Sequence, residues 1–385
     1  MDNSSLIIEK NSLLPASKIK MRDTKDYYLN LKDGPPISLI DIRKVISFLY
    51  SIKRRHKLHL IPIRIDLGER FFQDKFTYIL LESILHTLIE HYQCKIETIF
   101  NCRHNIFNEG IRHSCLVFSG VKNEGREKFL KKYPKDINGT HFRKTISPAG
   151  PSLQISLLAQ EIDCFLKNNF IVDECRNKIA LIIAELTDNA LEHANTECLI
   201  DIDVTQEYFK EQAIVNDGVY RGVNIVVMDY SETILCTPLR EKILNSNIFF
   251  ETKYVQYEEL KKAYGFHSQR WNSQYNQDDF FAIASFQDKI SGRNNSCTGG
   301  KGLTELLNAL QLKSDSYYCY CASGKRMISL SKEYTSIGVD SWIGFNKQKD
   351  FFNALPDEEC LKDLPFYFPG TAYNLNFVLK EEEGI

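Results

Sequence analysis

The sequence predicts an α+β protein in which a small α/β domain precedes a larger two-layer α/β sandwich. A chain of 385 residues with 43% hydrophobic content is long enough to form two buried cores. Helical and strand-like patterns alternate between residues 37 and 121, which favours a small α/β layer. A later series of short apolar runs is typical of the strands of a second sheet.

The first 36 residues are polar and end in Gly34-Pro35-Pro36, so residues 1–36 are expected to form a flexible leader. The small α/β domain is expected over residues 37–121. Its elements are expected as helix, strand, helix and strand, at 39–52, 60–67, 74–92 and 95–100.

Residues 122–144 are charged and interrupted by proline and glycine, which indicates a linker. The second domain is expected over residues 145–385, with a long lid over residues 231–298. Its sheet is expected to be mixed, with helices on one face. The strands of this sheet are expected at 141–146, 198–204, 224–229, 316–322, 327–330 and 371–379.

One helical segment carries three polar residues at a spacing of four: Glu185, Asn189 and His193. Residues at i and i+4 lie above one another on a helix face, so these side chains form a polar stripe. The carboxylate of Glu185 is suited to taking a proton from water, and the amide oxygen of Asn189 is a hard neutral ligand for Mg²⁺. A solvated helix face is the alternative interpretation of the stripe.

Two downstream features strengthen the catalytic interpretation. Asp229 ends a short apolar run that has the character of a buried strand. Gly299, Gly300, Lys301 and Gly302 form a turn before a helical segment, where free backbone N–H groups favour a phosphate. Lys301 and Arg293 are basic residues at this turn that are suited to phosphates, although solvated surface charges remain the alternative.

In this order, the polar helix, the acidic strand end and the glycine turn resemble the GHKL superfamily of ATP-binding proteins. That superfamily includes gyrase, MutL, Hsp90 chaperones and sensor histidine kinases, and the resemblance covers roughly residues 145–380. The C-terminal run from Phe368 to Val378 resembles the closing strand of the family, with Gly370 and Thr371 at its glycine-threonine positions. The resemblance implies a two-layer sandwich of the Bergerat type.

The resemblance also implies roles for individual residues. Glu185 matches the residue that activates the attacking water, and Asn189 matches the Mg²⁺ ligand. Asp229 matches the acid that binds the adenine amino group, while the glycine turn and Thr371 belong to the nucleotide-binding set. The chain departs from the family after Asp229, where Tyr230 and Ser231 stand in place of the usual glycine pattern.

Two further patterns are weaker. Cys102, His104, His113 and Cys115 have the residue types of a structural zinc site, but they lack the usual C-x-x-C knuckle, so ordinary thiols and imidazoles remain the alternative. The run from Ile65 to Leu81 resembles the STAS fold of anti-sigma antagonists. It lacks the phosphoacceptor motif of that fold, so Thr77 is assigned no phosphorylation role.

We therefore expect a cytoplasmic enzyme that binds ATP and Mg²⁺, hydrolyses ATP and acts as a nucleotide-driven switch in signalling or defence. Protein-kinase activity on a partner and a non-catalytic ATP-sensing scaffold remain alternatives. A protein partner or a homodimer is expected. The net charge of −2 gives no signal for nucleic acid, no apolar run is long enough for a membrane span, and eleven scattered cysteines suggest reduced thiols.

Overall fold

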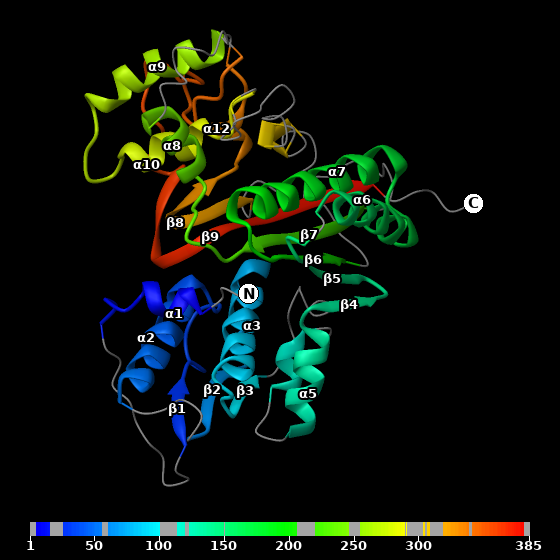
Figure 1. The fold of residues 1–385 in the computed structure, drawn as a ribbon. Coiled ribbons are helices and arrows are strands. Elements are labelled where there is room, and N and C mark those ends of the chain that lie inside the picture. Colours follow the sequence, from blue (N-terminus) through cyan, green and yellow to red (C-terminus); the bar gives the residue numbers. More distant parts are fainter. Residues whose placement is uncertain are drawn as a thin grey trace.

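A parallel and an antiparallel sheet, each packed against helices, form the framework of the molecule (Figure 1). The expected combination of helices and sheets is therefore confirmed. The computed structural model describes residues 5–15, 26–55, 61–100, 114–119, 123–149, 151–205, 220–245, 255–288, 290, 303–304, 306–308, 319–338 and 341–380.

The N-terminal unit, as we call the part from α1 to α5, has a three-stranded parallel sheet in the order β1-β2-β3. Strands and helices alternate along this unit, and a helical crossover between neighbouring strands places them parallel. Its elements are α1 (Leu6–Lys10), β1 (Tyr27–Asn30), α2 (Leu39–Arg55), β2 (Ile63–Gly68), α3 (Lys75–Glu90), β3 (Ile96–Phe100), the short 3₁₀ turn η1 (Cys115–Phe118) and α5 (Asn123–Lys132).

The larger sheet has six strands in the order β4-β5-β6-β7-β9-β8, and every neighbouring pair is antiparallel. The expectation of a mixed sheet is therefore wrong for the described strands. The stretch expected as a linker, 122–144, instead supplies α5, β4 and the start of β5. The strands are β4 (Lys135–Asn138), β5 (His141–Ile146), β6 (Cys198–Val204), β7 (Tyr220–Asp229), β8 (Tyr320–Ser329) and β9 (Leu361–Lys380).

Helices of the second half pack on one face of this sheet and beyond one end of it (Figure 1). Two of them, α6 and α7, lie along the face, while α8, α9, α10 and α12 gather near the end of β8. The described part of the expected lid, 231–298, thus contains three helices with buried aromatic side chains such as Phe280 and Phe281. The helices are α6 (Pro151–Asn168), α7 (Asp173–Asn189), the π-helical turn η2 (Ala190–Ala194), α8 (Thr237–Asn245), α9 (Val255–Ser268), α10 (Gln277–Ala284) and α12 (Lys332–Thr335).

The N-terminal unit covers the opposite face of the six-stranded sheet, so the sheet lies between two layers (Figure 1). The expectation of two layers is thus incomplete. Helix α3 explains the difference, because every side chain from Lys75 to Ile89 is buried. A helix that is apolar on nearly all sides requires partners on nearly all sides. The three-stranded sheet alone does not supply them, and the larger sheet covers the remainder.

The expected flexible leader is also part of this interface. Ile7 and Ile8 of α1 are fully buried in the core of the N-terminal unit. Asn11 donates a hydrogen bond to the Tyr367 carbonyl at 2.7 Å and accepts one from the Tyr367 N–H at 2.7 Å. The described part of the leader is therefore fixed to β9. Its mostly polar composition gives no indication that Ile7 and Ile8 belong to a core.

The buried position of α1 predicts that Ile8→Ala destabilises the whole protein. Removing a buried isoleucine side chain costs about 2–5 kcal/mol, because apolar area and packing contacts are both lost. Leu13→Ala is the matched control, since Leu13 is 96% exposed and the change should cost less than about 0.5 kcal/mol. Chemical denaturation of the full chain measures both values. Equal losses for the two variants would show that α1 is not docked.

Candidate functional site

Helix α7 presents Glu185 and Asn189 one turn apart on its outer side, as their spacing predicts. Glu185 is exposed and Asn189 is partly exposed, whereas Ile182, Ile183 and Leu186 are buried against the sheet. The apolar side chains of the helix therefore anchor it on the sheet. They leave a carboxylate and an amide accessible to a ligand.

The helix changes its geometry directly after Asn189. Residues Ala190–Ala194 form a single π-helical turn, which ends at Asn195 in the left-handed conformation (φ 51°, ψ 40°). His193 lies in this wider turn and is partly buried, so the regular stripe of three polar side chains extends only over the first two. Single π-helical turns are frequent at functional sites, because they re-aim side chains within a helix.

Asp229 ends β7 and points to the same face of the sheet as α7. Successive strand residues alternate between faces, and Val227, two residues earlier, packs in the core beneath α7. Cys198 on β6 is the register partner of Asp229, and its thiol interacts with the Thr187 hydroxyl of α7. Helix α7 and the acidic end of β7 are thus joined through Cys198.

The carboxyl of Asp229 is buried and only partly bonded. Its side chain is 5% exposed, and its Oδ1 has no hydrogen-bond partner among the described residues. Burial raises the pKa of Asp229 to about 7, and interactions with the Ser231 side chain and the Thr371 backbone oppose this rise. A buried carboxyl oxygen without a hydrogen-bond partner destabilises the fold, because it has lost its hydration. Asp229 Oδ1 is therefore a hydrogen-bond acceptor that lacks a donor.

The surroundings of this carboxyl are thiols, a phenol and backbone. Its titratable neighbours are Cys198, Cys321 and Tyr373, and burial raises the pKa of each of them. Gly370 lies directly against it with φ of 105°, and a Cβ there would approach Asp229 Oδ1 to 2.7 Å. Only glycine fits this close approach without displacing the carboxyl.

The structure therefore brings together some of the residues that the sequence singles out. Asp229 and Thr371 meet at the β7–β9 pairing. Helix α7, which carries Glu185 and Asn189, packs on the same face of the sheet. Several predicted residues lie outside the part of the chain that the structure describes, namely Arg293, Gly299, Gly300, Lys301, Gly302, Cys102, His104 and His113.

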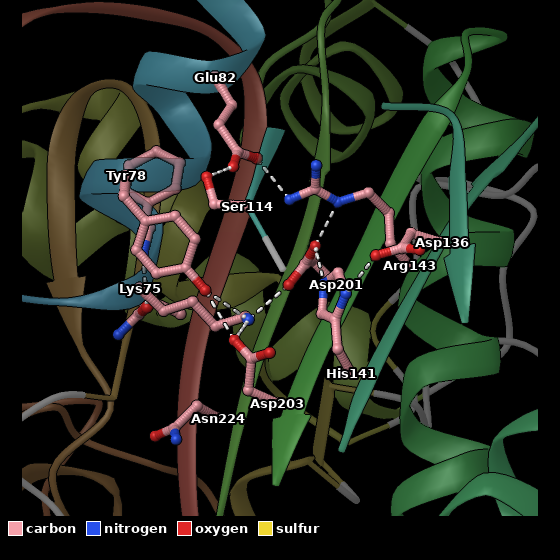
Figure 2. Close-up of polar contacts among 12 residues, drawn as sticks. Lys75, Tyr78, Glu82, Ser114, Asp136, His141, Arg143, Asp201, Asp203 and Asn224 are labelled. Atoms are coloured by element: carbon pink, nitrogen blue, oxygen red, sulfur yellow. Dashed lines mark hydrogen bonds and ion pairs between the residues drawn. The ribbon is translucent and has the colours of Figure 1, made fainter. Parts of the chain in front are cut away.

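A second polar cluster, which the sequence analysis did not identify, lies between α3 and the opposite face of the sheet (Figure 2). Lys75 of α3 forms ion pairs with Asp201 and Asp203 of β6. Tyr78 donates a hydrogen bond to Asp203 at 2.7 Å. Lys75 and Asp201 are completely buried and Asp203 nearly so. These contacts join the N-terminal unit to the sheet.

The cluster continues along β5 with a second ion-paired cation (Figure 2). Arg143 pairs with Asp201 on one side and with Glu82 of α3 on the other. Burial opposes the charge of Asp201, but Arg143, Lys75 and His141 together hold its pKa well below the usual range. Burial also opposes the charge of His141, yet the nearby carboxylates of Asp201 and Asp136 raise its pKa to about 9.

The geometry of this cluster does not fit a metal ion, although His141, Asp201 and Asp203 lie close enough to share one. The imidazole nitrogens of His141 already face Asp136 at 3.0 Å and Asp201 at 3.1 Å, and a protonated imidazole has no lone pair to donate. The Lys75 ammonium also lies against both aspartates. The cluster is therefore a network of buried ion pairs, in which Asp203 Oδ1 has no hydrogen-bond partner among the described residues.

The single described residue of the expected zinc site, Cys115, belongs to the same interface. Its Sγ lies 3.3 Å from Nη1 of Arg143, and burial raises the pKa of Cys115 to about 12.

Comparisons with family models, with curated proteins and with solved structures gave no match for this chain. The structure contains, over the residues it describes, no helix that is both long enough and apolar enough to cross a membrane.

The buried carboxyl of Asp229 predicts a specific dependence of stability on pH. The unfolded chain ionises near its ordinary pKa of 3.8, whereas the folded carboxyl keeps its proton up to about pH 7. The contribution of Asp229 to stability therefore falls as pH rises through this window. The free energy of unfolding of Asp229→Asn, relative to that of the native protein, should therefore increase by on the order of 4 kcal/mol between about pH 4 and about pH 8.

Urea denaturation at a series of pH values measures this difference. Asp33→Asn, at an exposed position, controls for the removal of one carboxylate. If the difference in free energy of unfolding between Asp229→Asn and the native protein does not change with pH, the raised pKa of Asp229 is contradicted.

The buried ion pairs predict that Lys75→Met is strongly destabilising. Removing one partner of a buried pair costs about 3–5 kcal/mol, because Asp201 and Asp203 lose a buried counter-ion. Lys128→Met is the control, since Lys128 makes an exposed ion pair with Glu124 and its loss should cost less than about 1 kcal/mol. Urea denaturation measures the loss of unfolding free energy in each variant. Similar losses in the two variants would show that the ion pairs between α3 and β6 are hydrated.

Proposed function

We propose that the chain binds ATP with Mg²⁺ on the α7 face of the six-stranded sheet and hydrolyses it. The observation that carries this proposal is the buried carboxyl of Asp229, whose Oδ1 lacks a partner beside Gly370. A planar ligand with an exocyclic amino group would supply the missing donor, and adenine is such a ligand. The resemblance to the GHKL superfamily assigns the same role to this residue.

Two residues of α7 suit the remaining parts of the nucleotide. Glu185 and Asn189 project from α7 on the side away from the apolar core, where a phosphate chain and a hydrated cation remain in contact with water. The amide oxygen of Asn189 is a suitable ligand for Mg²⁺, which prefers oxygen donors and keeps several waters. The carboxylate of Glu185 is one helical turn away, where it is suited to accept the proton of an attacking water.

Each residue then has one task in the proposed reaction. Bound MgATP supplies the phosphoanhydride bond and a cation that offsets its charge. Asp229 accepts the hydrogen bond of the base and fixes the orientation of the nucleotide. Asn189 holds the cation in place through its amide oxygen. Glu185 orients the water and removes its proton, and such general-base assistance typically accelerates a reaction by about 10²–10⁴-fold.

A comparison of binding with turnover tests the proposal on the purified full chain. We expect Glu185→Ala to bind MgATP with nearly unchanged Kd and to lose about 10²–10⁴-fold in kcat. At about pH 8, where the Asp229 carboxyl is ionised, Asp229→Asn should raise Kd roughly 10- to 100-fold, because a hydrogen bond to a charged group contributes about 1.5–3 kcal/mol. Calorimetry gives Kd, and phosphate release gives kcat.

The matched control is Glu174→Ala, which removes another exposed glutamate from α7 and should leave both quantities unchanged. Equal losses of turnover at Glu174 and Glu185 would contradict the assignment of the base. Binding without turnover in the unmodified protein would favour a sensing scaffold or a kinase that requires its partner. A native protein that binds no adenine nucleotide would refute the proposal.

A further inference from the structure

Asp229 and Tyr230 are consecutive residues that belong to opposite faces of the sheet. The Asp229 carboxyl lies on the α7 face, whereas the Tyr230 ring is buried in the core of the N-terminal unit. Strand geometry imposes this division, because successive side chains point to opposite faces. A single peptide bond joins the two residues, so a displacement of the backbone at one residue also displaces the other.

A chain of aromatic contacts continues from Tyr230 into α3. The centroids of the Tyr230 and Phe368 rings are 5.5 Å apart, and the centroids of the Phe368 and Phe76 rings are also 5.5 Å apart. Tyr230 is 7% exposed, and Phe368 and Phe76 are completely buried. Close-packed side chains have little free volume, so a displaced ring moves its neighbour.

The first turn of α3 is fixed to β8 and β9 by polar contacts as well. The backbone N–H of Phe76 donates to the Asn374 side chain at 3.1 Å. The buried Asp74 caps the helix through the N–H of Thr77, and the Tyr320 hydroxyl donates to Asp74 at 2.9 Å. The start of α3 therefore follows the position of these two strands.

The segment from Phe368 to Thr371 contacts both sides of this chain. The backbone of Thr371 holds the Asp229 carboxyl, Gly370 lies against it, and the Pro369 carbonyl accepts a hydrogen bond from the Ser231 N–H at 3.4 Å. On the other face, Phe368 packs between Tyr230 and Phe76. One short segment of β9 thus connects the carboxyl to α3.

We propose that the contacts Tyr230–Phe368–Phe76 couple the state of the Asp229 carboxyl, and with it nucleotide occupancy, to the first turn of α3. The inference about nucleotide rests on the proposed function, whereas the coupling between the carboxyl and α3 stands on the contacts alone. A ligand that bonds Asp229 Oδ1 changes the balance of hydrogen bonds to the Ser231 side chain and the Thr371 backbone. The segment from Phe368 to Thr371 responds, and Phe368 carries the response to α3.

Hydrogen exchange on the full chain, with and without MgATP, tests the nucleotide part. We expect nucleotide to slow exchange in α7 and β7 and to change exchange several-fold in residues 75–82. In Phe76→Leu the response of α3 should be lost while that of α7 persists. Phe48→Leu is the matched control, because Phe48 is equally buried in the N-terminal unit and makes no ring contact with Phe368 in the part of the chain described. There both responses should persist.

A second measurement needs no nucleotide. The pH dependence of the stability difference between Asp and Asn at position 229 gives the titration midpoint of the folded carboxyl. We expect Phe76→Leu to move this midpoint toward the ordinary value by at least about 0.5 pH unit, because looser packing at Phe368 admits water to the carboxyl. Phe48→Leu should leave the midpoint unchanged.

The outcomes separate this inference from the proposed function. Protection of α7 by MgATP with no change in α3 would overturn the coupling and leave ATP binding in place. The absence of any nucleotide binding would refute the proposed function. In that case an unchanged midpoint in Phe76→Leu would overturn the coupling, and a midpoint that moves only in Phe76→Leu would support it.

Discussion

The burial of α3 between two sheets is the constraint on which the rest of the structure depends. Its apolar side chains need a second layer, and its Lys75 and Glu82 need buried counter-charges. The six-stranded sheet supplies both, with an apolar surface along β7, β8 and β9 and an ionic surface along β5 and β6. Because breaking a buried pair costs more than forming it contributes, the cluster specifies one docking geometry and penalises alternatives. The N-terminal unit and the sheet therefore form one continuous structure.

The sequence predicts the elements of this fold better than their assembly. The strands at 141–146 and 198–204 and the helix at 39–52 are found close to their expected positions, because apolar periodicity is a local property. The docking is not local. Asp201 and Asp203 alternate with apolar residues in β6, a pattern that usually indicates a solvent-facing side. The complementary signals were His141 and Arg143 on the adjacent strand and a lone Lys75 in an apolar helix, and only tertiary contacts join them.

The candidate site likewise has features that the sequence predicts and features that depend on tertiary packing. The motif spacing selects Glu185, Asn189 and Asp229 as candidates, since helical period and strand ends are visible in sequence. It does not identify the π-helical turn after Asn189 or the unpartnered oxygen of Asp229, because both depend on packing. Ser231 has a local structural role that the sequence does not reveal. Its side chain interacts with the Asp229 carboxyl, and its hydroxyl donates to the Thr233 carbonyl at 2.6 Å, so this side chain stabilises the turn after β7.

A sheet covered on both faces places its two surfaces under a common constraint. Each residue of β7 that faces the candidate nucleotide site is followed by one that packs against the N-terminal unit. A displacement of Asp229 acts on Gly370, which lies against its carboxyl, and Phe368, two residues before Gly370, packs against Phe76. In a two-layer sandwich the second face borders water, and such a displacement would end there. In this chain the displacement reaches a buried helix whose first turn is capped by Asp74 and whose ion pairs have no access to water. The covering layer therefore turns a local change at the carboxyl into a change at the start of α3.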